Sequence, residues 1–270
     1  MTAFKKTIVA ASIAAAALFS ATASAGVFEV NPTGPSANFT ADRIGGTYIE
    51  VASFNTTAGT FDVSLYFRAT SFVSDGLAIE SGDTGLGQNY GMYAVYKASG
   101  TITQEGTNTK FSFLPGTGGL SLYLDANRNT TLGVTPTSGT GNFTFGNNSD
   151  DVILATGEAI TGEGNLDPSL STCGTGAGSG INCGSFGSTT GFDLTAAGMD
   201  FFVAPNPFYN LSFQSGQLIN FPVSGTQIIR GSLDVVFENA AEVPEPASVG
   251  LLGLGMLGLY AARRRNKKAA

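Results

Sequence analysis

Apolar and polar residues alternate along several stretches of the chain. In residues 60–68, TFDVSLYFR, every second residue is apolar, beginning with Phe61. Residues 119–126 (GLSLYLDA), 208–215 (FYNLSFQS) and 232–239 (SLDVVFEN) show the same pattern. Because successive side chains of a strand point to opposite faces of a sheet, this period of two predicts strands with one buried face and one solvated face.

Turn residues separate these stretches and indicate the fold class. Clusters such as NTTAG, SGDTG and LPGTGG interrupt the alternation, and residues 26–240 contain no convincing amphipathic helical pattern. We therefore expect an all-β protein in which residues 26–240 form one antiparallel β-sandwich domain. Residues 157–190 are rich in Gly, Ser and Thr, so we expect a loop there.

The beginning of the chain has the three parts of a secretory signal peptide. Lys5 and Lys6 are positively charged, residues 7–21 are almost entirely apolar, and small residues ending at Ala25 suit a cleavage site. We expect a signal helix over residues 1–25 that signal peptidase removes, so that the exported protein begins after Ala25.

The end of the chain combines a short apolar segment with a basic tail. Residues 248–262 are apolar or small and would extend about 22 Å as a helix, less than the ~30 Å hydrocarbon core of a bilayer. Arg263, Arg264 and Arg265 follow directly, and positive charge of this kind stays in the cytoplasm and leaves the body of the chain outside. We expect a short transmembrane helix that acts as a transient inner-membrane anchor, with a plain single-span anchor as the alternative.

The charge of the chain between these two ends is strongly negative. Twenty acidic and only six basic residues lie between Glu29 and Glu245, which gives a net charge of −14. Such a surface repels phosphate groups, so we expect no nucleic acid partner. It suits a protein that stays soluble outside the cell, or one that meets cations and neutral sugars.

Cysteine usage agrees with export. Cys173 and Cys183 are separated by nine residues in a segment rich in Gly and Ser, and the chain has no other cysteine. A redox pair or a metal site would need C-x-x-C spacing or further ligands. We therefore expect a structural disulfide, which stabilises the protein by about 2–3 kcal/mol in the chain-entropy model. Because the loop lies outside the alternating strands, its loss should lower stability only modestly.

The residue types present restrict the possible chemistry. The chain has no histidine and no tryptophan, which excludes Ser-His-Asp and Cys-His catalysis as well as every His-based metal site. A glycosidase needs only two carboxylates, so a secreted carbohydrate-active enzyme with a carboxylate pair stays open as the alternative. Our prediction is a protein that is not an enzyme and has no cofactor other than a possible calcium ion.

A calcium site is one interpretation of an oxygen-rich stretch. Asp125, Asn127 and Asn129 alternate directly after a predicted strand, as ligands do at the start of many calcium loops. The full EF-hand pattern fails, because Pro136 occupies the twelfth position, where a Glu is needed. Asx-rich turns also join strands without any metal, so both interpretations remain open.

The last residues of the chain carry a family resemblance. Residues 243–270 read VPEPASVGLLGLGMLGLYAARRRNKKAA, with Pro-Glu-Pro before the apolar segment and arginines after it. This order resembles the PEP-CTERM sorting signal of Gram-negative bacteria. The resemblance implies recognition by exosortase, cleavage near Pro244, Glu245 and Pro246, and release or transfer to the cell surface. Proteins with this signal tend to occur in bacteria that make extracellular polysaccharide, where they join biofilm or floc matrices.

The body of the chain carries a further resemblance. Stretches such as YGMYAVYKASG, LSLYLDANRNTT and FFVAPNPFYNLSF look like the order of motifs in flocculation-associated PEP-CTERM proteins. This implies a protein of the cell surface or extracellular matrix that promotes aggregation, in flocs or biofilms, by association with extracellular polysaccharide. The resemblance carries over no individual binding residues. The carbohydrate-active enzyme remains the alternative.

Overall fold

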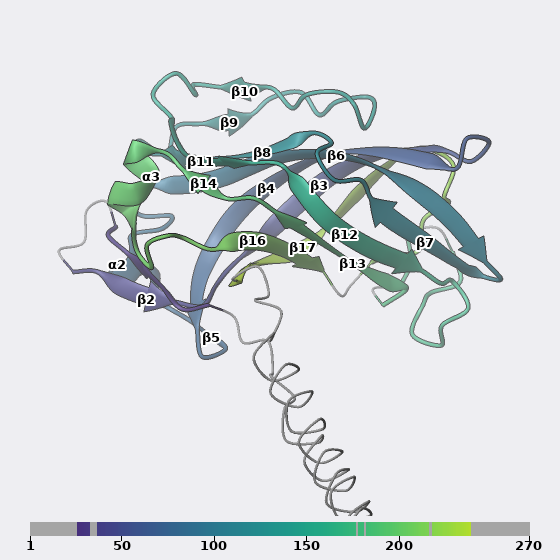
Figure 1. Ribbon diagram of the computed structural model, residues 1–270, viewed down its shortest axis with the longest axis horizontal. Helices are drawn as coiled ribbons and strands as arrows, with labels where there is room; N and C mark the ends of the chain where they lie inside the picture. Colours follow the sequence, from purple (N-terminus) through teal and green to yellow (C-terminus); the bar gives the residue numbers. More distant parts are fainter. Residues whose placement is uncertain (1–25, 33–36, 177, 181, 216–217, 239–270) are drawn as a thin grey trace, which may run out of the picture. The chain divides into compact units, whose positions relative to one another are not determined.

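The alternating stretches form strands of one large antiparallel sheet (Figure 1). The computed structural model describes residues 26–32, 37–176, 178–180, 182–215 and 218–238. Within these residues, twelve strands belong to this sheet and all of its pairings are antiparallel. The prediction of an all-β, antiparallel protein is confirmed.

Eight of the strands close into a barrel-like ring. The ring closes because β6 pairs with β4 along one edge and with β7 along the other, while β3 pairs with both β4 and β17. In order around the ring, the strands are β4 (Thr60–Ser74), β6 (Gly91–Glu105), β7 (Asn108–Phe113), β12 (Ala159–Leu166), β13 (Gly184–Thr190), β16 (Asn210–Ser215), β17 (Gly225–Glu238) and β3 (Arg43–Asn55).

The sheet forks at β6. The second half of β6 pairs with β7 in the ring, whereas its first half pairs with β8 (Gly119–Asp125). From β8 the sheet continues to β11 (Val152–Gly157) and β14 (Asp193–Leu194), and β5 (Leu77–Ala78) pairs with the end of β4. A strand of fifteen residues can therefore serve both the ring and this extension.

The remaining elements are short. Strands β1 (Phe28–Val30), β2 (Phe39–Ala41) and β15 (Phe202–Ala204) form a three-stranded sheet, and β9 (Thr131–Leu132) pairs with β10 (Phe145–Gly146). The helices are α2 (Ser81–Thr84) and α3 (Ala196–Phe201). Thr195 caps α3, since its Oγ1 accepts a hydrogen bond from the backbone N–H of Gly198 at 3.1 Å.

No helix within the described residues is long and apolar enough to cross a membrane. The predicted signal helix at residues 1–25 and the predicted transmembrane helix at residues 248–262 lie outside the described residues.

The β-sandwich prediction needs correction. Instead of two sheets packed face to face, a single sheet closes on itself. Alternation of apolar and polar residues predicts only that each strand buries one face. A sandwich and a closed ring both satisfy that condition. The pairing of β6 with both β4 and β7 decides between them, and it joins residues that no local pattern connects.

The apolar residues of the alternating strands point into the ring and form its core. Phe61, Val63, Leu65 and Phe67 of β4 are each at most 3% exposed. Opposite Phe61, Gly100 of β6 has no side chain, and a Cβ there would overlap the phenylalanine ring. The glycine is therefore a packing requirement of the closed ring.

The expected loop at residues 157–190 contains two strands. Residues 159–166 and 184–190 are β12 and β13 of the ring, so only the connection between them is irregular. Gly162 and Gly164 both lie in β12. A Cβ atom at Gly162 would be 2.8 Å from the ring of Phe113, and one at Gly164 would be 3.4 Å from the ring of Phe111. Large side chains of the neighbouring strand thus cover the small residues, an arrangement that β propensity does not reveal.

Candidate functional site

The outer face of four neighbouring ring strands forms an open groove of about 600 Å³, which we name the polar groove. Strands β7, β12, β13 and β16 provide its floor. Apolar residues of these strands point into the ring, so the alternating positions on the outside carry polar or small side chains. The hydrogen-bonding side chains that line the groove include Lys110, Glu163, Asn165, Thr189, Ser212 and Gln214.

The groove presents amide, hydroxyl and charged groups with few contacts among themselves. Asn165 accepts a hydrogen bond from the Ser185 hydroxyl at 3.0 Å, and this contact does not use its two amide donors. The Gln214 amide donates to Ser212 at 3.4 Å. Gly187 of β13 lies between Glu163 and Gln214 on the neighbouring strands. Because it has no side chain, the floor of the groove is shallow there.

A second depression, of about 540 Å³, lies on the outer face of β3, β4 and β6. We name it the arginine cleft, because Arg68 of β4 and Arg128 of the turn after β8 both line it. Tyr66 and Asp125 also line it, together with Thr130 near β9. Both arginines are exposed, whereas Asp125 is only 5% exposed.

An aromatic cluster on the outer face of the sheet supports this cleft. The rings of Tyr93 and Tyr123 stack with centroids 4.9 Å apart, and Phe145 of β10 lies 4.9 Å from Tyr93 and 5.6 Å from Tyr66. In Figure 1, β9 and β10 accordingly lie alongside β8 at the top of the view. The segment that contains β9 and β10 is thus packed on the sheet by aromatic contacts.

The tyrosine hydroxyl at the centre of this cluster is held by a carboxylate. Tyr93 donates a hydrogen bond to Asp151 at 2.6 Å. Burial, together with this hydrogen bond and the negative charge of Asp151, raises the pKa of Tyr93. The hydroxyl therefore stays protonated and ties β6 to the residues before β11.

The three candidate calcium ligands lie in one turn. The two carboxylate oxygens of Asp125 accept hydrogen bonds from the backbone N–H groups of Asn129 and Thr130, each at 3.1 Å. Asn127 donates from its amide to Asp150 at 2.5 Å. This is the geometry of an Asx-rich turn, and within the described residues no three Cys, Asp or Glu side chains cluster as a metal site. Calcium binding at these residues stays a prediction.

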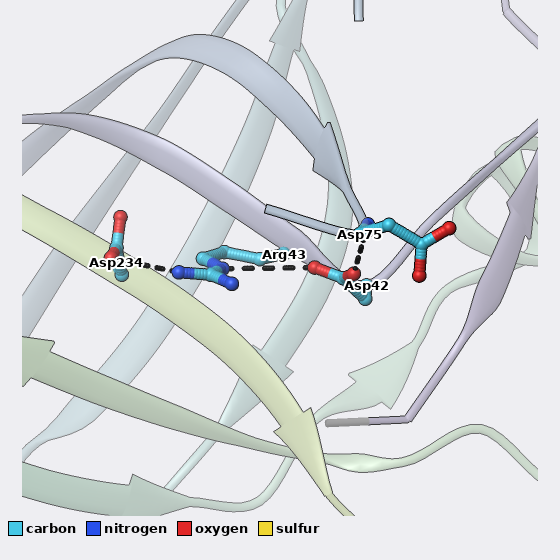
Figure 2. Close-up of polar contacts among 4 residues, drawn as sticks. All are labelled: Asp42, Arg43, Asp75 and Asp234. Carbon is cyan, nitrogen blue, oxygen red and sulfur yellow. Dashed lines mark hydrogen bonds and ion pairs between the residues drawn. The ribbon is translucent and has the colours of Figure 1, made fainter. Parts of the chain in front are cut away.

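Arg43 forms the centre of a charged cluster outside both depressions (Figure 2). Its Nε lies 3.6 Å from Oδ1 of Asp42, and its Nη1 lies 3.5 Å from Oδ2 of Asp234 on β17. Asp42 also accepts a hydrogen bond from the backbone N–H of Asp75 at 2.7 Å. The Arg43 charge thus helps to join β3 to β17, and Asp42 joins the start of β3 to the turn after β4.

Glu50 is a buried carboxyl that sequence reasoning missed. It occupies an inward position on β3, is 9% exposed, and lines a void of about 30 Å³ with Phe54 and Phe186. Burial raises its pKa from 4.5 to about 7. The period of two in β3 could have shown it, since Glu50 shares a face with Tyr48 and Phe54.

Cys173 and Cys183 form a disulfide, with their Cα atoms 4.5 Å apart. Cys183 is fully buried and lies directly before β13. Its backbone N–H donates to the Leu218 carbonyl at 2.9 Å, and its carbonyl accepts from the Asp167 N–H at 2.7 Å. The expectation that the cysteines lie outside the core is therefore wrong for Cys183. The disulfide ties the connection after β12 to the ring.

The comparison with protein families adds a result from the end of the chain. Residues 242–265 match the family model of the PEP-CTERM protein-sorting motif. The chain is a PEP-CTERM sorting-domain protein. No curated protein and no solved structure matches it.

The motif gives this PEP-CTERM protein a route through the cell. It marks an exported chain with exosortase as processing partner, which is anchored transiently in the membrane before it is sorted to the cell surface. The predicted processing residues, Ala25 and 244–246, lie outside the described residues, as do the arginines at 263–265.

Two carboxylates of the PEP-CTERM protein accept hydrogen bonds from Thr130, which lines the arginine cleft. Asp125 accepts from the backbone N–H of Thr130, and Asp151 accepts from the hydroxyl of the same residue at 2.8 Å. Asp151 also accepts from Tyr93. These carboxylates are thus engaged in holding the turn and the aromatic cluster together.

Proposed function

We propose that this PEP-CTERM protein is a surface or matrix protein that promotes cell aggregation, in flocs or biofilms, by associating with extracellular polysaccharide. The sorting motif supports the location, because exosortase substrates are sorted to the cell surface. The polar groove is the observation that carries the choice of ligand.

A polysaccharide can form hydrogen bonds with the polar side chains that line the groove. Each sugar residue presents hydroxyl groups that donate and accept hydrogen bonds, and the groove presents amides, hydroxyls and a carboxylate in return. The groove is open and low, so an extended polymer can lie along it without entering a cavity. Many weak contacts of this kind along one polymer add up to useful affinity.

Binding rather than catalysis is the role that we assign to these surfaces. Asp125 and Asp151 both accept hydrogen bonds from Thr130, and Asp151 also accepts one from Tyr93. A glycosidase instead needs one carboxyl that donates a proton and one carboxylate that attacks or activates water. The sequence alternative of a carboxylate-pair enzyme has no comparable support.

Deletion of the gene tests the proposed function. We expect the mutant cells to lose aggregation while they still synthesise the polysaccharide, which is then shed into the medium. Microscopy of flocs and sugar analysis of pellet and supernatant measure the two effects. Unchanged aggregation, or loss of polysaccharide synthesis itself, would contradict an adhesive matrix role.

A variant of the groove tests the site. Asn165→Ala together with Gln214→Ala removes two amides that line it, and cells carrying this variant should retain less polysaccharide. Gln88→Ala removes an exposed amide outside the groove and serves as the control. If both variants restore aggregation in the deletion strain equally well, the groove is not the site.

A further inference from the structure

The structure describes six basic residues, and three of them, which lie outside the arginine cleft, already have a polar partner. Arg43 is held between two aspartates, Lys110 pairs with Glu105 at 2.7 Å, and Lys97 donates to the Thr140 carbonyl at 2.8 Å. The other three are Arg68, Arg128 and Arg230. None of the described carboxylates lies within ion-pair distance of these three arginines.

The strand register places these arginines along one surface. Arg230 of β17 lies opposite Ile49 of β3, which lies opposite Tyr66 of β4. Arg68 follows Tyr66 by two residues and therefore shares its face. Neighbouring strands are about 4.8 Å apart, so Arg230 lies roughly 10 Å from β4. Arg128 lines the cleft from the turn after β8, and all three arginines are exposed.

The cleft leaves the guanidinium groups available to a ligand. Arg128 donates from Nη1 to the Gln88 carbonyl at 2.6 Å, which fixes the side chain beside the cleft and leaves its other donors unused by that contact. Asp125 is buried, and its oxygens already accept two backbone hydrogen bonds. Tyr66, partly buried between the arginines and Phe145, adds a ring to the floor.

We propose that the arginine cleft binds the carboxylate groups of an acidic polysaccharide, with Arg68 and Arg128 as its contacts and Arg230 as a further contact along the polymer. A guanidinium group matches a carboxylate with two parallel hydrogen bonds, and such charge-assisted pairs are the stronger ones. The proposal rests on the proposed function for the class of polymer and adds the charge of its sugars. It does not depend on the polar groove.

The charge of the whole surface selects against a nucleic acid at the same place. Duplex DNA carries one negative charge per ~1.7 Å, and the net charge of −14 between Glu29 and Glu245 repels so dense a charge. A polymer of uronic acids carries one carboxylate per sugar residue and can place single groups between the arginines. Binding of DNA is therefore an outcome that the experiment must distinguish.

Calorimetric titration of the full chain in mild detergent tests the cleft. The probes are oligomers of alginate, a polyuronate, and the same oligomers after chemical reduction of their carboxyl groups, both in calcium-free buffer. We expect the acidic form to bind at least tenfold more tightly than the reduced form, and its binding to weaken as salt is raised. Arg68→Gln and Arg128→Gln should each weaken it about tenfold, and Arg68→Lys should retain part of the affinity.

Controls separate loss of contact from loss of folding. Lys97→Gln removes one positive charge outside both the arginine cleft and the polar groove and should bind as the wild type does. Because Arg128 also bonds Gln88, its variant is checked by circular dichroism, and Arg68→Glu carries the test if Arg128→Gln unfolds. Equal binding of acidic and reduced oligomers, unchanged binding by the Arg68 variants, or equally tight binding of duplex DNA would overturn the proposal.

The two proposals can fail separately. If deletion of the gene abolishes aggregation but the chain binds no polyuronate, the proposed function stands and the carboxylate-binding cleft is overturned. If the arginines bind polyuronate but deletion leaves aggregation unchanged, the cleft is supported and the aggregation role fails.

Discussion

Glu50 is a carboxyl group enclosed by the ring, and its burial links the stability of the protein to pH. Burial raises its pKa from 4.5 to about 7, so the folded protein holds a proton that the unfolded chain releases. This contribution is fully present below pH 4.5 and is lost as pH rises towards 7. Over that range we expect the free energy of unfolding to fall by about 3 kcal/mol. Thermal unfolding between pH 4 and 8 measures the slope.

Glu50→Gln removes the titrating group while keeping nearly the same shape. We expect its melting temperature to vary less between pH 4.5 and 7, and to exceed that of the wild type above pH 7. Glu163→Gln, which removes an exposed carboxyl on the outer face of the ring, is the matched control. A variant of Glu50 that follows the wild-type pH curve would show that this carboxyl is not the cause.

Asp125 joins the turn after β8 through two backbone hydrogen bonds, and its removal leaves two N–H groups without these acceptors. Asp125→Ala should therefore lower the free energy of unfolding by roughly 1–3 kcal/mol in calcium-free buffer. Denaturant unfolding measures this, with Asp167→Ala, an aspartate in another surface turn, for comparison. A stability equal to that of the wild type would contradict the structural role.

The calcium hypothesis has its own measurement on the same variant. A ligand that binds the folded state raises the melting temperature as its concentration rises. Millimolar calcium should thus stabilise the wild type but not Asp125→Ala, if Asp125, Asn127 and Asn129 hold the ion. If calcium shifts the melting temperature equally in both proteins, or in neither, these residues form a turn that does not bind the metal.

The disulfide acts on a pair of strands rather than on a free loop. Cys183 lies in the core directly before β13, and the connection that it closes begins at the end of β12. We therefore expect Cys173→Ser with Cys183→Ser to lower the free energy of unfolding by about 3 kcal/mol or more, since the loss of core packing adds to the loss of the cross-link. Denaturant unfolding of the variant and of the reduced wild type separates the two contributions.

Oxidation of the cysteines can be measured directly on protein recovered from cells. Mass spectrometry should find Cys173 and Cys183 joined, because an exported chain passes through an oxidising compartment. Free thiols in that protein would contradict both the disulfide and the stability argument built on it.

The strands differ in how far their sequences predict them. β4 and β8 alternate strictly and were predicted with their buried faces, because a period of two is a local property. β13 consists largely of Gly, Ser and Thr, and β12 contains two glycines; they are strands because β7 and β16 pair with them on either side. Ring closure at β6 could not be predicted for the same reason, since it depends on partners far apart in the chain.

The candidate sites show the same limit more strongly. The turn at Asp125 and the cysteine pair are local, and the sequence points to both. Arg68 and Arg128 lie sixty residues apart and meet only because β4, β6 and β8 are neighbours in the sheet. No motif marks such a cleft, whereas the sorting motif at residues 242–265 is continuous in the sequence and can be predicted from it.

Export and sorting act on the molecule as a whole, and the two ends of the chain divide this work. Acidic residues dominate from Glu29 to Glu245, whereas the arginines at 263–265 follow the apolar segment. By the positive-inside rule, we expect these arginines to keep the tail in the cytoplasm while the body is outside. A short apolar segment is a weak anchor, which suits the transient anchoring of a chain that exosortase processes.

Processing at the Pro-Glu-Pro sequence gives the most direct prediction for the intact protein. Protein collected from the cell surface or the medium should lack residues 251–270 and end close to Pro246. Changing Pro244, Glu245 and Pro246 to alanine should leave the apolar segment able to insert but should block processing. Because proline restricts its own backbone and that of the preceding residue, we expect an extended segment that an enzyme can reach, and alanine would remove that constraint. Fractionation with mass spectrometry of the C-terminus measures both results.

Asn239→Ala, just before the matched motif, is the control and should be processed normally. The triple variant should instead accumulate at full length in the inner membrane, and aggregation should fall because less protein reaches the surface. Its basic tail holds it there, since moving Arg263, Arg264 and Arg265 across the bilayer is strongly unfavourable. Tail peptides recovered from extracellular material, or normal processing of the triple variant, would replace this mechanism with a plain single-span anchor.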